Sequence, residues 1–258
     1  MGLDISTILS EWPYEPGQVT VRRIRGADGR EKIQLRLDLG LLQMETTGRP
    51  DGLHPHGAES LFQYHHRRLE RHTREHGSEE GFSLDGGVCE KLRSEAVMYY
   101  HRYLAEYVLE DYEAVERDTR RNLHVMDFMK AYAEEPSDQT MMEQYRPYVL
   151  MMSARSRGQL ALQRERPKLA MEVVRGAVQA IRDFYRETGR EELIDVSGEL
   201  AVLRAFRKEI QQAIPVDPAE RLRREMEKAV HDERYEDAAR LRDELHKLQH
   251  THADGGGT

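Results

Sequence analysis

The sequence predicts a mainly α-helical protein with a β-hairpin near the N-terminus and an antiparallel pair of helices at the C-terminus. Three observations support this prediction. Strict alternation of apolar and polar residues is confined to residues 18–39. From residue 58 onward, apolar residues recur at the spacing of an amphipathic helix. Two prolines, Pro215 and Pro218, then separate a last pair of helical segments from the rest.

The composition and net charge of the chain narrow the classes of function that we expect. Charged residues make up 33% of the chain and hydrophobic residues 38%, a balance that suits long amphipathic helices with solvated faces. The net charge of -8 argues against a broad nucleic-acid-binding surface, so we do not expect nucleic acid as a direct ligand. The single cysteine, Cys89, allows no internal disulfide and fits a reducing compartment. No apolar run is long enough to span a bilayer, so we expect a cytoplasmic protein without membrane association.

Residues 1–57 are expected to form an N-terminal segment built around the hairpin. Its strands are Gln18–Ile24 and Glu31–Leu39, and Asp28-Gly29 between them supplies the turn. A third strand over Leu41–Thr47 is a further option. Because an isolated hairpin is only marginally stable in water, this one must pack on helices or pair with another chain.

A loop rich in glycine and proline, Gly48–Gly57, closes this segment and carries His54 and His56. These two histidines are candidate metal ligands, although no carboxylate–histidine spacing of a known metal site accompanies them. Surface histidines in a polar loop are the alternative. The "GRPDG" sequence within the loop is typical of a turn. Other side chains that chemistry at this loop would draw on are Asp51, Glu59, His65, His66 and Cys89.

Residues 58–213 are expected to form a helical domain. Each of its segments places apolar residues at i, i+3, i+4 and i+7, which predicts one buried face per helix. The expected helices are Ala58–His76, Glu90–Leu109, Tyr112–Ala133, Met141–Arg164, Pro167–Thr188 and Ser197–Ala213.

Two stretches of this domain, Tyr99–Asp118 and Ser153–Val174, are similar to each other, and each consists of helix, polar turn and helix. With Arg102 and Ala105 before "LEDYEAV", the first stretch resembles a tetratricopeptide-like helical pair. The offset between the stretches is longer than the family period of about 34 residues. The resemblance implies stacked helical hairpins with a concave groove, and an ordinary helical bundle remains equally open.

Residues 217–250 are expected to form an antiparallel helical hairpin, followed by a disordered tail over residues 251–258. Asp217 and Glu220 form a capping box around Pro218, which marks the start of a helix. The apolar stripes of the two helices can then meet along a seam, where the alanines permit close approach. The stripes comprise Leu222, Met226, Ala229 and Val230 on one helix, and Tyr235, Ala238, Ala239, Leu241, Leu245 and Leu248 on the other.

This segment resembles the UVR motif, named for the bacterial excision-repair proteins UvrB and UvrC. In that family the motif is a helical hairpin that binds another protein, often through a second hairpin of the same kind, and performs no chemistry. The residues that carry the resemblance are Met226, Ala229, Tyr235, Glu236, Ala238, Ala239, Arg242, Asp243, Leu245 and Leu248.

The resemblance implies a protein partner, such as another UVR-motif protein or a second copy of this chain. A hairpin this small buries little apolar surface alone, so exposed apolar groups favour a partner. The alternative is a hairpin that folds back onto the helical domain. The candidate partner-binding residues are Leu222, Met226, Val230, Tyr235, Ala238, Ala239, Leu241, Arg242, Leu245 and Leu248.

Sequence motifs of catalysis are missing. The chain has no phosphate-binding GxxxxGK[ST] loop, no HExxH motif and no paired CxxC motifs, so we assign no catalytic residue and expect no cofactor. The leading hypothesis is a non-enzymatic adaptor or scaffold, which the resemblance links to DNA repair or protein quality control. The alternative is a metal- or ligand-binding protein, centred on the His54/His56 loop. Direct DNA binding by the hairpin ranks third, because its charges are nearly balanced.

Overall fold

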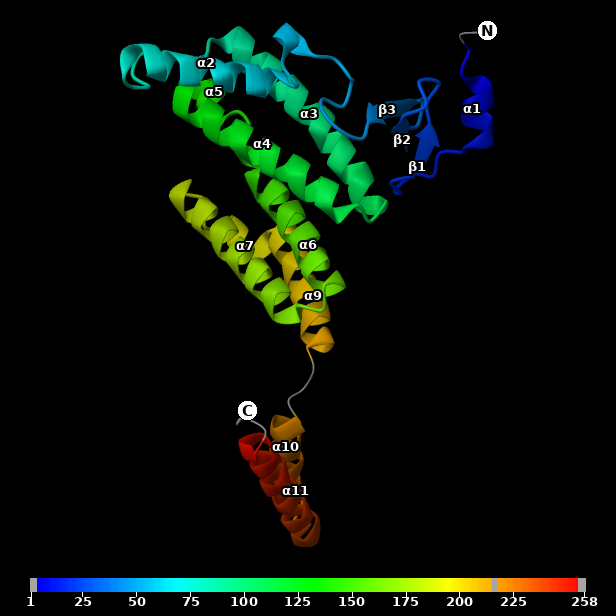
Figure 1. The fold of residues 1–258 in the computed structure, drawn as a ribbon, viewed down its shortest axis with the longest axis vertical. Coiled ribbons are helices and arrows are strands. Elements are labelled where there is room, and N and C mark those ends of the chain that lie inside the picture. The colour runs from blue at the N-terminus through cyan, green and yellow to red at the C-terminus, as the bar shows by residue number, and fades with distance from the viewer. Residues whose placement is uncertain (1–3, 215–217, 255–258) are drawn as a thin grey trace. The chain divides into compact units, whose positions relative to one another are not determined.

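The computed structural model describes residues 4–214 and 218–254, and these residues are mainly helical. The chain divides into two compact units, Met1–Ile210 and Gln211–Thr258. The first unit holds a three-stranded sheet and the helices up to α9, and the second holds helices α10 and α11 (Figure 1).

The sheet is antiparallel, with strand order β1 (Val21–Arg25), β2 (Glu31–Arg36) and β3 (Leu41–Glu45). The third strand, which was an option from sequence, is therefore present. The expectation that the second strand continues to Leu39 was wrong. Leu37 and Gly40 form a turn in which the Leu37 amide donates to the Gly40 carbonyl at 2.9 Å, so β2 ends first and Leu39 is 87% exposed.

The sheet packs on helix α3 (Gly86–Val108) through one apolar face, as its marginal stability requires. Ile33, Leu35 and Met44 are buried there with Ala105 of α3. Arg36 is also buried, and its guanidinium donates to the backbone carbonyls of Trp12 and Gly40 at 2.7 and 2.8 Å. The apolar face therefore holds the sheet on α3, and Arg36 connects the sheet to the segment that follows residues 6–11.

Each expected helix between residues 58 and 213 is present, and caps explain where the ends differ. Ser60 accepts a hydrogen bond from the Gln63 amide, so helix α2 begins at Leu61 and not at Ala58. Asp85 caps α3 in the same way, which moves its start back from Glu90 to Gly86. The helices are α1 (Ser6–Glu11), α2 (Leu61–His76), α3, α4 (Tyr112–Tyr132), α5 (Pro136–Thr140), α6 (Arg146–Gln163), α7 (Pro167–Glu187), α8 (Leu193–Val196) and α9 (Gly198–Ala213), with short 3-10 turns η1 (Pro55–Gly57) and η2 (Glu143–Tyr145).

The long helices pack in succession: α3 contacts α4, α4 contacts α6, and α6 contacts α7 (Figure 1). A core of Leu61, Leu92, Met126 and Val149 joins α2, α3, α4 and α6. This succession fits both interpretations of the sequence, stacked helical pairs and an ordinary helical bundle.

The turns of the α3–α4 and α6–α7 hairpins have the same backbone geometry. Glu110 and Glu165 both occupy the left-handed region, with φ of 58° and 54°. The following amide, of Asp111 or Arg166, bonds back to a carbonyl five residues earlier at 2.9 or 2.8 Å, which is a Schellman motif. The internal similarity seen in sequence therefore corresponds to two equivalent hairpin turns.

In the second unit, helices α10 (Pro218–His231) and α11 (Tyr235–Asp254) pack against each other as the expected hairpin. Its turn is of the same kind, with Glu233 at φ 58° and the Arg234 amide bonded to the Ala229 carbonyl at 2.8 Å. Helix α11 continues beyond residue 250 to Asp254, because no glycine or proline interrupts it before Gly255. Asp217, the expected cap, lies outside the described residues.

Candidate functional site

A narrow apolar seam joins the two helices of the C-terminal hairpin. Leu222, Ala229 and Ala238 are buried, with 5%, 1% and 8% of their surface exposed. Met226, Leu241 and Leu245 are half-buried. Ala229 and Ala238 are the buried residues nearest the turn, and their small side chains permit the close approach of the helices that the sequence predicted.

The remaining candidate partner-binding residues lie outside this seam. Val230 is 50% exposed and Tyr235 is 67% exposed, because the turn places both at the closed end of the hairpin. Ala239 is exposed, since its neighbour Ala238 takes the position that faces α10. Placing these three residues in the seam was therefore wrong. The side chain of Leu248 lies outside the described residues.

The polar surface of the hairpin carries ion pairs within each helix and around the turn. Arg234 and Arg240 both contact Asp237, at 3.2 and 3.3 Å. Arg242 lies 2.9 Å from Asp243. Exposed pairs of this kind contribute at most about 1 kcal/mol each. The stability of the hairpin therefore depends on the apolar seam, and the exposed apolar groups at its closed end add nothing to it.

Comparison with known families supports the assignment of this hairpin. Residues 218–251 match the family model described as the UvrB/uvrC motif. This motif mediates protein–protein contacts. No family model confirms the tetratricopeptide-like resemblance of the helical domain. Neither curated proteins nor solved structures gave a match to the chain. Within the described residues, no helix combines the length and apolar character needed to cross a membrane.

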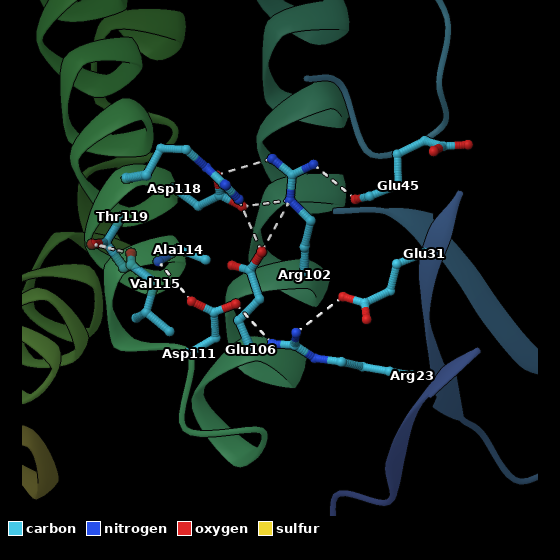
Figure 2. A network of polar contacts seen from close by, with 11 residues as sticks. Arg23, Glu31, Glu45, Arg102, Glu106, Asp111, Ala114, Val115, Asp118 and Thr119 are labelled. Atoms are coloured by element: carbon cyan, nitrogen blue, oxygen red, sulfur yellow. Dashed lines mark hydrogen bonds and ion pairs between the residues drawn. The ribbon is translucent and has the colours of Figure 1, made fainter. Parts of the chain in front are cut away.

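The first unit contains a buried ionic cluster that the sequence analysis missed. Arg102 of α3 forms a bidentate pair with Asp118 of α4, with N–O distances of 2.6 and 2.9 Å. The third nitrogen of the same guanidinium donates to the Glu45 carbonyl at 3.0 Å, at the end of strand β3 (Figure 2). One side chain thus joins two helices and the sheet.

Glu106 lies beside this pair and is also buried. Its Oε1 atom is 2.9 Å from Arg117 and 3.7 Å from Arg102, while its Oε2 atom has no hydrogen-bond partner within the described part of the chain. Burial and the nearby Asp118 carboxylate raise the pKa of Glu106 to about 8, against the opposing effect of the two arginines.

A second carboxylate, Glu95, connects α3 to the start of α2. It accepts hydrogen bonds from the Leu61 and Phe62 amides at 2.7 and 3.1 Å, where the helix dipole favours a negative charge. Arg121 bonds to Glu95 and stacks on the Tyr99 ring at 3.9 Å. Glu95, Tyr99, Arg102 and Glu106 follow the apolar face of α3, and charges on an otherwise apolar face are the sequence signal that identifies such a cluster.

An open groove of about 750 Å³ runs beside this cluster. Helices α2 and α4 supply most of its walls, and Tyr99 and Arg102 of α3 lie at its base. Glu59, one of the candidates for chemistry, lines it as well. Most of the donor groups of Arg102 and Arg121 are already satisfied within the protein, so the cluster serves mainly to hold the helices together.

The histidine candidates do not converge. His54 and His56 are exposed, and His56 stacks on Tyr64 at 4.2 Å. His65 is buried, with its Nδ1 atom 3.0 Å from the Arg68 guanidinium, and His66 pairs with Glu70 at 3.3 Å. Among the described residues, no group of three or more histidine, cysteine, aspartate or glutamate side chains is arranged to hold a metal ion.

Asp51 and Cys89 have structural roles. Asp51 accepts a hydrogen bond from the Leu53 amide at 3.0 Å and pairs with Arg49 at the same distance. Gly52, with φ of 74°, bonds to the Arg49 carbonyl, so "GRPDG" is the turn that the sequence favoured. Cys89 is fully buried, and burial raises the pKa of its thiol to about 11, which disfavours the reactive thiolate.

Proposed function

We propose that this protein is a non-enzymatic adaptor whose C-terminal hairpin docks a protein partner. The observation that carries the proposal is the match of residues 218–251 to a protein-interaction motif, together with the exposure of Val230 and Tyr235 on that motif. Tyrosine is enriched among the residues that dominate binding energy at interfaces, and the exposed valine adds apolar area that a partner can bury. Docking of a protein partner requires no catalytic residues in the hairpin.

The partner that fits this surface is a second helical hairpin with a complementary apolar end. When two such hairpins pair into a four-helix arrangement, they bury the apolar groups that a single hairpin exposes to water. We propose that the partner is another UVR-motif protein, with pairing of two copies of this chain as the second option. DNA repair and protein quality control are the processes that the motif suggests.

The first unit supplies the scaffold in this proposal. Its sheet and stacked helices present the groove between α2 and α4, which is available to a second ligand. The lone cysteine, buried and unpaired, suits a protein of the cytoplasm. The domain limits that we propose for function are 58–213 for the helical domain and 217–250 for the docking hairpin.

The direct test compares the full chain with a truncation that ends at Ile214. Both are used for affinity capture from native lysate, and light scattering reports their oligomeric state. We expect a partner or a dimer with the full chain and loss of either with the truncation. Identical capture and the same oligomeric state for both proteins would refute docking by the hairpin.

Point variants test the exposed residues of the hairpin and its buried seam independently. Val230→Ser with Tyr235→Ser removes exposed apolar groups and leaves the buried seam intact, so it should abolish binding without loss of helix. Glu227→Ser, on the exposed part of α10, is the matched control and should bind normally.

Ala238→Asp or Leu241→Asp places a carboxylate in the seam and should unfold the hairpin while the first unit stays folded. Unfolding of the whole protein by these seam variants, seen by circular dichroism, would contradict the proposal.

A further inference from the structure

A second cavity of the first unit lies on the other side of α3, away from the ionic cluster. Its volume is about 510 Å³, within the range typical of small-molecule sites. Helices α3 and α4, the segment from η2 into α6, and the start of α9 enclose it. Helices α3, α4 and α6 pack in succession, and the start of α9 belongs to the same compact unit, so the cavity is formed within one unit of the fold.

Tyrosine rings dominate the lining of this cavity. Tyr100, Tyr103 and Tyr148 all line it. The Tyr100 ring lies 5.6 Å from that of Tyr103 at an interplanar angle of 88°, and 6.0 Å from that of Tyr148 at 60°. Tyr145, which is 54% exposed, lies at the rim. Four tyrosine side chains therefore line one cavity, and aromatic rings attract a cation that lies over their faces.

The charges around the cavity are unequal. Glu199, from the first turn of α9, contributes a carboxylate that accepts one hydrogen bond, from Ser197 at 2.8 Å, within the described residues. Arg93 is the one lysine or arginine among the described lining residues, and Glu90 already pairs with its guanidinium at 3.0 Å. Burial lowers the pKa of His101, so its imidazole is neutral near pH 7. The cavity therefore offers a negative group without a free positive one.

From this geometry we propose that the tyrosine cavity binds an organic cation, of the alkylated ammonium class. A cation over aromatic faces gains electrostatic energy that rises when the site excludes water, and a bulky alkylated ammonium also fills an apolar volume. Inorganic cations are unsuited, because they need oxygen ligands to replace their water shell. The occupant has two sources with the same chemistry: a small solute such as choline, or a methylated lysine side chain of another protein.

Isothermal titration of the full chain with choline tests the proposal. The decisive control is the uncharged isostere of choline, in which a tert-butyl group replaces the trimethylammonium group. We expect choline to bind and the isostere to bind at least about tenfold more weakly, since only choline gains the cation–π and carboxylate terms. Equal binding of both would show a purely apolar cavity, and binding of neither would show no such site. Both outcomes overturn the proposal.

Two variants and one peptide complete the test. Glu199→Gln removes the charge and keeps the shape, and Tyr148→Leu removes one ring; each should weaken choline binding about fivefold or more. Glu191→Gln makes the same chemical change at an exposed residue and should leave choline binding unaltered. If Glu199→Gln also leaves it unaltered, the assignment of the site is wrong. A short peptide with a trimethylated lysine distinguishes the source, because tighter binding than choline points to a protein ligand.

Discussion

At the scale of single residues, the first unit depends on charges that are withdrawn from water. Arg102, Glu106 and Asp118 each have only 1% of their surface exposed. Burying such ions is costly, and mutual pairing offsets that cost only when the geometry is good. The bidentate Arg102–Asp118 contact meets this condition and fixes how α3 and α4 pack. These residues therefore specify how the helices pack, and loss of Arg102 leaves Asp118 with the partly exposed Arg117 as its remaining ion-pair partner.

Replacement of Arg102 should be strongly destabilising. Arg102→Met leaves the buried Asp118 carboxylate without its bidentate partner, so the free energy of unfolding should fall by about 3–5 kcal/mol. Urea denaturation followed by circular dichroism measures this change. Arg120→Met, which removes an exposed pair with Glu116 at 2.8 Å, is the matched control and should cost under about 1 kcal/mol. Equal losses in the two variants would show that the buried cluster has no special role.

His65 gives the protein a defined pH dependence. Its Nδ1 atom faces the Arg68 guanidinium, which requires a neutral ring, and burial and that positive charge lower its pKa from 6.5 to about 4. The unfolded state then binds the proton more tightly, so this contribution to stability is complete above pH 6.5 and is lost as the pH falls toward 4. His65→Gln should flatten the dependence of unfolding free energy on pH in that window. An unchanged profile, or an NMR titration of His65 near pH 6.5, would refute this.

At the scale of elements, one glycine determines how closely α6 and α9 approach. A Cβ atom built on Gly158 would lie 2.5 Å from the Phe206 ring, which is itself buried. Because glycine is otherwise unfavourable within a helix, its presence here is explained by this contact. Gly176 of α7, by contrast, has no atom within 4 Å of an added Cβ.

These two glycines form a matched pair for a stability test. Gly158→Ala should lower the unfolding free energy by about 1–2 kcal/mol, since the clash exceeds the gain in helix propensity. Gly176→Ala should raise it by about 0.5–1 kcal/mol, because only the gain in propensity remains. Phe206→Leu should relieve the clash when it is combined with Gly158→Ala. Stabilisation by Gly158→Ala alone would mean that the contact is not restrictive.

The same scale shows what the sequence predicts well. Periodicity located long helices such as α7, whose buried residues lie on one face, and Pro167 marked the start of α7 as expected. Helix α6 is buried on more than one side, because it contacts both α4 and α7. The predicted helix ends were less accurate, because caps such as Ser60 and Asp85 act through polar side chains, which the spacing of apolar residues does not reveal. The hairpin was found from its motif, whereas exposure of Tyr235 depends on the geometry of the turn. The ionic cluster and the tyrosine cavity were missed because they join residues from several helices, and only the fold determines those contacts.

At the scale of the whole molecule, the two units differ in how much core each contains. The first has a continuous apolar core and buried ion pairs across several helices. The described part of the second has a seam between two helices, with Leu222, Ala229 and Ala238 as its buried apolar residues. A unit of that size seldom has more than about 3–5 kcal/mol from its core. We therefore expect the hairpin to be the less stable unit and to gain stability from its partner.

Amide hydrogen exchange of the full chain tests this difference. Amides of α10 and α11 should exchange through openings that cost at most about 3 kcal/mol, while those of α3 and α4 should approach the global unfolding free energy. Adding the captured partner, or raising the concentration if the chain self-associates, should slow exchange in α10 and α11 and leave α3 and α4 unchanged, because binding stabilises only the unit that binds. Equal protection in both units without a partner would show that the hairpin does not need a partner for its stability, which contradicts this expectation.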